Sequence, residues 1–456
     1  MWSARRLACA VLALSFACAN VQAGTAEGYE AGRRGDYATA LREFQPAAEK
    51  GDRDAQLALA DMYLRGYGVT ADPAAAARWF RKAAEQGDAR AQTNLGFLLE
   101  QGKGVARDFE EAAKWYRKAA EQGEPTAQSN LSYMALIGRG VPQDDMQAAH
   151  WATLAAKQGL AVAQYRLGVF YTNGQGVERD DAQALRWYKA AADQGDARAQ
   201  SALGWVYSEG RGVPRDLAAS LGWLRLSAAQ GDATAEHNLG MALLNGRGAP
   251  RDPVDALHWI SKSAESGYAP AQVSLGLLYA AGDAVAADEK QAVDWYRKAA
   301  AQGNASGQNN LGWMLTNGLG IARDDAAALA GFRAAAAQGL APARHNLGYM
   351  VANGLGGVPR PDLAAGVALQ GLAREASSPS PEDLPALDPS RLAAAERARS
   401  DQLLAAFRSA PDLLAVLDST AGPPSVASLP PATGSPAVSG NGMDGHTVAP
   451  PSATQR

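Results

Sequence analysis

Residues 163–195 read AQYRLGVFYTNGQGVERDDAQALRWYKAAADQG, and closely similar stretches return every 36 residues along most of the 456-residue chain. Nine leucines mark this period: Leu59, Leu95, Leu131, Leu167, Leu203, Leu239, Leu275, Leu311 and Leu347. Nine glycines from Gly66 to Gly354, and seven tryptophans from Trp79 to Trp295, keep the same spacing. A fixed period of this length indicates a stack of supersecondary units, each packed on its neighbours, rather than one globular core.

Each unit is expected to begin with an amphipathic helix. In the unit that starts near Gly87, Ala91, Leu95 and Leu98 lie at positions i, i+4 and i+7, on one face of a helix. The chain then reaches Gly102, a residue that tolerates the left-handed conformation with which many helices end. The first helix of every unit is therefore predicted to place its leucine columns in the core.

A second helix is predicted to start at an aspartate. Asp108 can accept hydrogen bonds from the free N–H groups of the helix that follows it. The same column holds Asp36, Asp72, Asp144, Asp180, Asp216, Asp252, Asp288 and Asp324. The second helix is expected to bury Ala112, Ala119 and either Trp115 or Tyr116. The tryptophan column then fills the space between successive units.

The quoted stretch also carries a consensus at fixed positions. Its members here are Ala163, Gln164, Leu167, Gly168, Tyr171, Gly174, Gly176, Val177, Asp180, Ala184, Trp187, Tyr188, Ala191, Ala192 and Gly195. This pattern resembles the Sel-one-like repeat (SLR) family, a relative of the tetratricopeptide repeat. The resemblance implies an all-α fold, a right-handed α/α superhelix (solenoid) of about nine 36-residue two-helix repeats with helical caps.

The repeats and the composition together predict the organisation of the chain. The expected segments are a signal peptide at 1–23, an N-terminal capping helical unit at 24–50, nine repeats at 51–376, a linker at 377–387, a C-terminal helix or cap at 388–419, and a disordered Pro/Ser/Gly/Ala tail at 420–456. The tail has too few apolar residues and too little charge pairing to order itself.

The first residues have the features of a secretory signal. Arg5 and Arg6 precede the apolar run 7–17, which is too short to span a bilayer. Small residues then suggest cleavage after Ala23, and a periplasmic or secreted protein is expected. A lipoprotein that carries its lipid on Cys18 is the alternative, although the residues before Cys18 fit a lipobox poorly.

Composition narrows the function classes. The only cysteines, Cys9 and Cys18, lie in the predicted signal peptide, so we expect no disulfide and no thiolate chemistry in the mature chain. The formal net charge is −4, and a mildly acidic chain is a poor candidate for binding nucleic acid. No apolar run after the signal reaches the length of a membrane span, so the mature chain is expected to have no transmembrane segment.

The sequence offers no catalytic or cofactor motif. It contains neither His-Glu-x-x-His nor Ser-x-x-Lys, and its literal Gly-x-Gly-x-x-Gly lies in the predicted tail with no strand before it. His237 with His345, and His150 with His258, stand three units apart, too far to share a metal. We therefore expect surface or groove histidines, no metal, no cofactor and no enzymatic activity.

The first helices carry an unexpected apolar column on the face opposite their core leucines. Two residues after each leucine the helix has turned about 200°, where a merely solvated column would be polar. The column reads Phe97, Tyr133, Val169, Trp205, Met241, Leu277, Trp313 and Tyr349. Three residues earlier, on the same face, lie Asn94, Asn130, Arg166, Asn238, Ser274, Asn310 and Asn346.

In related repeats the first helices line the concave face. Amides can bond a peptide backbone in both directions, and aromatic residues are favoured binding anchors. The candidate partner-binding residues are Asn94, Phe97, Asn130, Tyr133, Trp205, Asn238, Asn310, Trp313, Asn346 and Tyr349. The other interpretation is that the apolar column packs between adjacent first helices and is hidden.

Three functions are compatible with these features. The preferred hypothesis is an exported scaffold or adaptor that binds a protein or peptide partner through the concave face, in a bacterial envelope complex or regulatory pathway. A secreted factor that binds a host or competitor molecule is the second. A lactam-binding or hydrolytic enzyme is the third, and it lacks a visible nucleophile with a base.

Overall fold

The structure is a computed structural model that describes residues 23–376 and 383–420. All but the last residue of the predicted signal peptide (1–23), and all but the first residue of the predicted tail (420–456), lie outside these residues. The described ranges form 22 α-helices and one short 3-10 helix, without strands, and the all-α prediction is confirmed. No helix in these ranges combines the length and apolarity that a membrane crossing requires.

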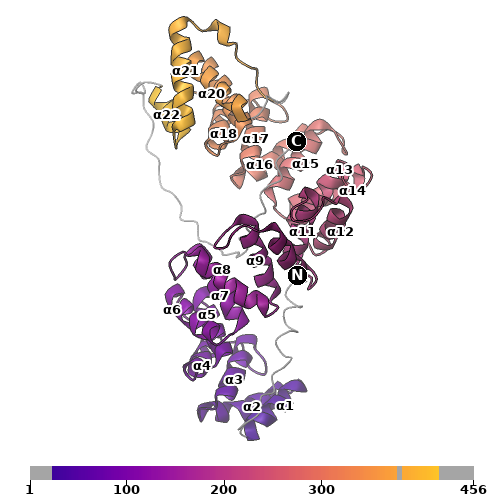
Figure 1. Cartoon of the computed structure of the whole chain (residues 1–456), viewed down its shortest axis with the longest axis vertical. Helices are drawn as coiled ribbons and strands as arrows, with labels where there is room; N and C mark the ends of the chain where they lie inside the picture. The colour runs from indigo at the N-terminus through magenta and orange to yellow at the C-terminus, as the bar shows by residue number, and fades with distance from the viewer. Residues whose placement is uncertain (1–22, 377–382, 421–456) are drawn as a thin grey trace. The chain divides into compact units, whose positions relative to one another are not determined.

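Two helices form each repeat of the solenoid (Figure 1), and consecutive helices pack on each other from α1 to α10 and again from α12 to α21. The first helices are α3 (Arg53–Arg65), α5 (Ala89–Gln101), α7 (Pro125–Ile137), α9 (Ala161–Asn173), α11 (Ala197–Glu209), α13 (Ala233–Leu244), α15 (Ala269–Ala281), α17 (Ala305–Asn317) and α19 (Ala341–Asn353). The second helices are α4 (Pro73–Glu85), α6 (Phe109–Glu121), α8 (Asp145–Lys157), α10 (Asp181–Ala192), α12 (Leu217–Ala228), α14 (Pro253–Glu265), α16 (Glu289–Ala301), α18 (Asp325–Ala337) and α20 (Leu363–Ala376).

The remaining helices lie at the two ends: α1 (Ala23–Arg33), α2 (Tyr37–Glu49), the 3-10 helix η1 (Pro389–Arg391), α21 (Ala394–Ser409) and α22 (Leu413–Thr420). The contacts divide the chain into two compact units, which we call the N-terminal unit (to Ala199) and the C-terminal unit (from Gln200). The division falls within α11.

The first helices end as the sequence predicts. Gly102 has φ 66°, and its N–H donates to the carbonyl of Leu98 at the end of α5. The second loop glycine has a different reason. A Cβ on Gly104 would lie 2.3 Å from the backbone of Pro73, so only glycine lets this loop cross the start of the preceding repeat's second helix.

The second helices bury the second of the two aromatic residues between which the sequence left the choice open. Asp108 caps α6 by accepting from the N–H of Glu111, as predicted. Tyr116 is fully buried, and its ring lies where a Cβ on Gly96 would clash at 2.8 Å. Trp115 is 8% exposed, and the other tryptophans of its column are half-buried. The residue after each tryptophan, rather than the tryptophan, therefore fills the centre of the repeat.

Residues 383–420 pack on the last repeats of the C-terminal unit. Helix α21 packs on α20, and α22 packs on α18. Arg399 of α21 donates both of its Nη groups to the carboxylate of Asp362, at 2.9 and 2.6 Å. Residues 383–387 belong to the segment that composition assigns to a linker. They nevertheless lie against the last repeat, and Leu384 is only 5% exposed.

Candidate functional site

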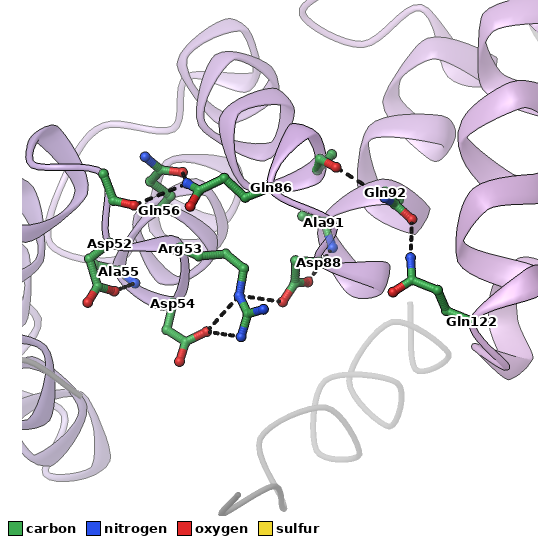
Figure 2. Close-up of polar contacts among 12 residues, drawn as sticks. Asp52, Arg53, Asp54, Ala55, Gln56, Gln86, Asp88, Ala91, Gln92 and Gln122 are labelled. Atoms are coloured by element: carbon green, nitrogen blue, oxygen red, sulfur yellow. Dashed lines mark hydrogen bonds and ion pairs between the residues drawn. The ribbon is translucent and has the colours of Figure 1, made fainter. Parts of the chain in front are cut away.

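A ladder of glutamines joins successive repeats (Figure 2). Gln92 on α5 donates through Nε2 to the carbonyl of Ala84 in the preceding repeat, at 3.1 Å. Its Oε1 accepts from Nε2 of Gln122, which follows α6, at 2.8 Å. The same side-chain pair recurs as Gln56–Gln86, Gln128–Gln158, Gln164–Gln194, Gln200–Gln230, Gln272–Gln302 and Gln308–Gln338. These buried amides satisfy backbone groups between repeats, so the glutamine column is structural and offers no ligand site.

The ladder is interrupted in the sixth repeat. Glu236 replaces its glutamine and Ser266 replaces the partner. The Glu236 side chain is almost fully buried, and its Oε1 lies 2.7 Å from Nζ of Lys262. An ion pair thus stands where other repeats have an amide pair, and Ser263 compensates in part by donating to the carbonyl of Ala233.

The candidate residues of the N-terminal unit include the most open part of the first-helix face. Phe97 on α5 is 45% exposed, the largest exposure in its column. Asn94 lies one turn before Phe97 and is half-buried, and its side chain has no hydrogen bond to a described residue. Tyr133 on α7 is half-buried, and Asn130 bonds the hydroxyl of the buried Tyr116. Asn94 and Phe97 are therefore the candidates with both a free amide and an open apolar surface.

Arg166 occupies the asparagine column on α9, next in the series after Asn94 and Asn130. Its Nη1 donates to the carbonyl of Ser129 at 2.6 Å, and its guanidinium lies 5.3 Å from the ring centroid of Tyr133. Burial, and the repulsion of the nearby Arg198 cation, lower the pKa of Arg166 to about 10. The side chain therefore stays charged at neutral pH within a partly desolvated site.

The corresponding residues of α11 and α13 make more contacts with other side chains than Asn94 and Phe97 do. Trp205 is half-buried, with the guanidinium of Arg211 5.1 Å from its ring centroid. Asn238 is half-buried and hydrogen-bonds His237, whose Nε2 lies 2.9 Å from Oγ of Ser274 in the next repeat. Burial lowers the pKa of His237 to about 4. These side chains link repeats as well as lining the face.

Helix α17 continues this trend. Trp313 is half-buried and packs against two hydrophobic clusters, one mainly of the preceding repeat and one of its own and the following repeat. Asn310 accepts from Nδ2 of Asn309 at 3.2 Å. The interpretation that this column packs between first helices therefore fits Trp313 better than it fits Phe97.

At α19 the first-helix face is covered by residues from the segment 383–420 of the same chain. Asn346 is fully buried: its Oδ1 accepts from the N–H of Leu384 at 2.7 Å, and its Nδ2 donates to Asn309 at 3.0 Å. His345 lies 2.7 Å through Nε2 from the carbonyl of Leu384 and is 2% exposed, so its expected surface position is wrong. Tyr349 is half-buried against the cluster that includes α21 and α22.

Gln370 explains how the stack ends. This fully buried residue of α20 takes the position that Phe332 holds in the preceding repeat. Its Oε1 accepts from the N–H of Leu387 at 2.8 Å, and its Nε2 donates to the carbonyl of Pro385 at 3.2 Å. An amide suits this position because the Pro385 carbonyl and the Leu387 N–H, which lie in no helix, need hydrogen-bond partners.

Two polar residues of the first-helix face are absent from the candidates derived from sequence. The sequence pattern contains a signal for Arg166, because this residue is the charged member of the asparagine column. Asp61 on α3 stands two residues after Leu59, at the head of the Phe97 column. Burial raises the pKa of Asp61 to about 6, against the opposing effect of Arg65 and Arg90.

Comparison with known families identifies the repeats. The Sel1 repeat model matches nine consecutive segments, at residues 53–88, 89–124, 125–160, 161–196, 197–232, 233–268, 269–304, 305–340 and 341–369. The chain belongs to the Sel1 repeat family. The resemblance drawn from the sequence is confirmed, and a Sel1 repeat solenoid is a scaffold of a kind typical of protein binding.

Two solved structures of SLR proteins resemble this Sel1 repeat protein. One is a protective antigen of uropathogenic Escherichia coli strains, 30% identical, with a TM-score of 0.52 over 89% of this chain and 96% of that one. The other is a Sel1 repeat protein from Oxalobacter formigenes, 38% identical, with a TM-score of 0.50 over 62% of this chain and 84% of that one. No protein of curated function matches the chain.

Proposed function

We propose that this Sel1 repeat protein is an exported scaffold or adaptor that binds an extended segment of a protein partner. The binding surface is the first-helix face of α5, α7 and α9, which would be the concave face in related repeats. The proposal adds no catalytic step, metal or cofactor, because the sequence contains no motif for them. A bacterial envelope complex or regulatory pathway is the proposed setting.

One observation carries the proposal. Phe97 exposes 45% of its surface, and the unengaged amide of Asn94 lies one helical turn away. A large apolar side chain beside a free amide suits a peptide that buries one side chain and bonds its backbone to the amide. The other large apolar residues of this column are half-buried.

The proposed export rests on the N-terminal sequence. Arg5 and Arg6, the apolar run 7–17 and small residues before Ala23 favour cleavage after Ala23. N-terminal sequencing of the purified protein would test this site directly. A mature chain that starts at Gly24 supports it, whereas a lipid on Cys18 supports the lipoprotein alternative.

Site-specific photo-crosslinking in cells tests the binding surface. A photoreactive amino acid replaces Asn94 in one strain and the exposed Lys114 of α6 in a matched control strain. We expect one discrete protein adduct from position 94, its loss when Phe97→Ala is added, and no such adduct from position 114. Equal adducts from both positions, or none from position 94, would contradict the proposed surface.

A secreted factor that binds a host or competitor molecule is the second candidate. The observation that favours it is the likeness, at 30% identity, to a protective antigen of uropathogenic strains. A secreted factor would use the same binding surface as the scaffold, but it would act outside the cell rather than in the periplasm. Mature protein in the culture medium of unlysed cells would favour this candidate, and retention in the periplasm would favour the resident scaffold.

A further inference from the structure

An unpaired cation lies on the same face as Phe97. Arg166 on α9 is half-buried, and only Ser129 accepts hydrogen bonds from it within the described part of the chain, both through Nη1. Its Nε and Nη2 donors have no partner there, and neither is among the atoms that are buried without one. These two donors are therefore unpaired among the described residues and are not fully buried.

Among residues 23–376 and 383–420, no acidic side chain acts as a counter-ion for Arg166. The titratable groups that act on it are Arg198, Tyr133 and Tyr165, with no carboxylate among them. Arg198 lies at the start of the next first helix, and it is already paired with Asp196 at 2.8 Å. A partly desolvated guanidinium without a counter-ion is unfavourable, and a bound anion relieves that cost.

Two tyrosines flank this cation. The Arg166 guanidinium lies 5.3 Å from the ring centroid of Tyr133, and the Arg198 guanidinium lies 4.8 Å from that of Tyr165. Aromatic faces hold guanidinium groups in place without neutralising them. The two donors that remain on Arg166 form the planar fork that matches a carboxylate.

From this arrangement we propose that Arg166 binds a carboxylate of an acidic peptide whose apolar residue contacts Phe97. The inference rests on the proposed function and names the chemistry of the partner segment. Helix layers about 8–10 Å apart put Arg166 about 16–20 Å from the Phe97 helix. An extended chain covers that distance in about five or six residues. The partner motif is thus an apolar residue and an acidic residue about five or six positions apart.

Synthetic peptides with acetylated and amidated ends test the motif on the intact protein. The first set consists of serine-rich peptides that carry one leucine and one glutamate at varied spacings, in both orders. The second set replaces glutamate with glutamine. The third set has glutamine and a free C-terminal carboxylate, so that it separates a chain end from an acidic side chain as the source of the anion.

We expect the glutamate peptides to bind roughly tenfold to hundredfold more tightly than their glutamine partners, as charged hydrogen bonds do. The preference should be largest at a spacing of about five or six residues and should fall as salt is added. If the free C-terminal set binds better than the glutamate set, a chain end supplies the carboxylate. Fluorescence anisotropy gives each dissociation constant.

Three variants complete the test. Arg166→Asn, which restores the common residue of the column, should abolish the preference, and Arg166→Lys should retain part of it. Lys114→Gln removes an exposed cation from α6 and should leave the preference unchanged. Equal binding of glutamate and glutamine peptides, or a preference that survives in Arg166→Asn, would overturn the inference while leaving the peptide surface intact. Failure of every peptide to bind would instead overturn the proposed function as well.

Discussion

The first-helix face differs between the N-terminal unit, at α5, and the C-terminal unit, at α19. Asn94 and Asn346 occupy the same repeat position, yet the Asn94 side chain has no hydrogen bond to a described residue, whereas the Asn346 side chain is fully buried and makes two. Phe97 is 45% exposed, whereas Tyr349 packs against the C-terminal cluster. The same column is thus exposed in one unit and packed in the other, because the neighbouring segments differ.

The two units also differ in their glutamine ladders. In the N-terminal unit, all four glutamine pairs from Gln56 onward are formed. In the C-terminal unit, Glu236 replaces the first glutamine of the sixth repeat and Arg344 replaces that of the ninth. Repeats with interrupted ladders depend on other contacts, such as the Glu236–Lys262 ion pair. Stability is therefore expected to be distributed unevenly along the solenoid.

The largest expected effect comes from the asparagine column. Asn346→Ala should destabilise the protein by about 2–4 kcal/mol, because it leaves the buried Leu384 N–H and the Asn309 amide without partners. Asn94→Ala, the same change at the same repeat position, should alter stability by less than about 0.5 kcal/mol. Urea unfolding of both variants measures the contrast. Equal losses would mean that Asn94 is a packing residue too.

The apolar column provides the next contrast. Trp313→Ala should cost about 2–3 kcal/mol, since the ring packs against two hydrophobic clusters. Phe97→Ala should cost about 1 kcal/mol or less because nearly half of the side chain is exposed. Thermal melts give the stability order, and crosslinking from position 94 reports binding. If Phe97→Ala unfolds the protein as readily as Trp313→Ala, the open surface at α5 has been wrongly assigned.

The carboxyl at the head of the column should make the N-terminal unit sensitive to pH. Burial raises the pKa of Asp61 to about 6 in the folded protein, from an ordinary value of 3.8. The folded state therefore holds this proton more tightly, and stability falls as the pH rises from about 4 to about 6. In Asp61→Asn, the loss of stability between pH 4 and pH 6 should be smaller by about 1–2 kcal/mol. This figure allows for the partial exposure of the side chain, which weakens the effect.

Urea unfolding at pH 4 and pH 7 measures the effect of Asp61 as a difference between variant and wild type. Glu85→Gln, an exposed carboxylate on α4, is the control and should show the wild-type slope. An identical pH slope in Asp61→Asn and the wild type would show that Asp61 does not contribute.

The smallest expected effect is a gain. The double variant Glu236→Gln with Ser266→Gln should complete the ladder in the sixth repeat and stabilise the protein by about 1 kcal/mol. Glu236→Gln alone is the control, because it loses the Lys262 ion pair without gaining the second amide. A higher urea midpoint for the double variant than for both wild type and control is the expected result. No gain over the control would mean that the amide pair contributes little.

Several parts of the fold could be predicted because they depend on contacts within one repeat. Asp108 caps α6, Gly102 ends α5, and Leu95 is fully buried, each from local rules of helix termini and periodicity. The choice between Trp115 and Tyr116 stayed open in the sequence. The structure resolves it through Gly96, which makes room for the tyrosine ring on the facing helix.

The candidate site was only partly predictable. The sequence alone identified the columns that contain Phe97 and Asn346, together with the repeat family and the two helices of each unit, because a 36-residue period fixes which residues share a face. Only the tertiary structure decided which members of those columns are open. That depends on segments distant in sequence, such as Leu384, whose N–H reaches Asn346 38 residues away. Exposure is a property of the neighbours that pack on a residue, and a repeat pattern does not encode where the stacking ends or what covers the last repeat.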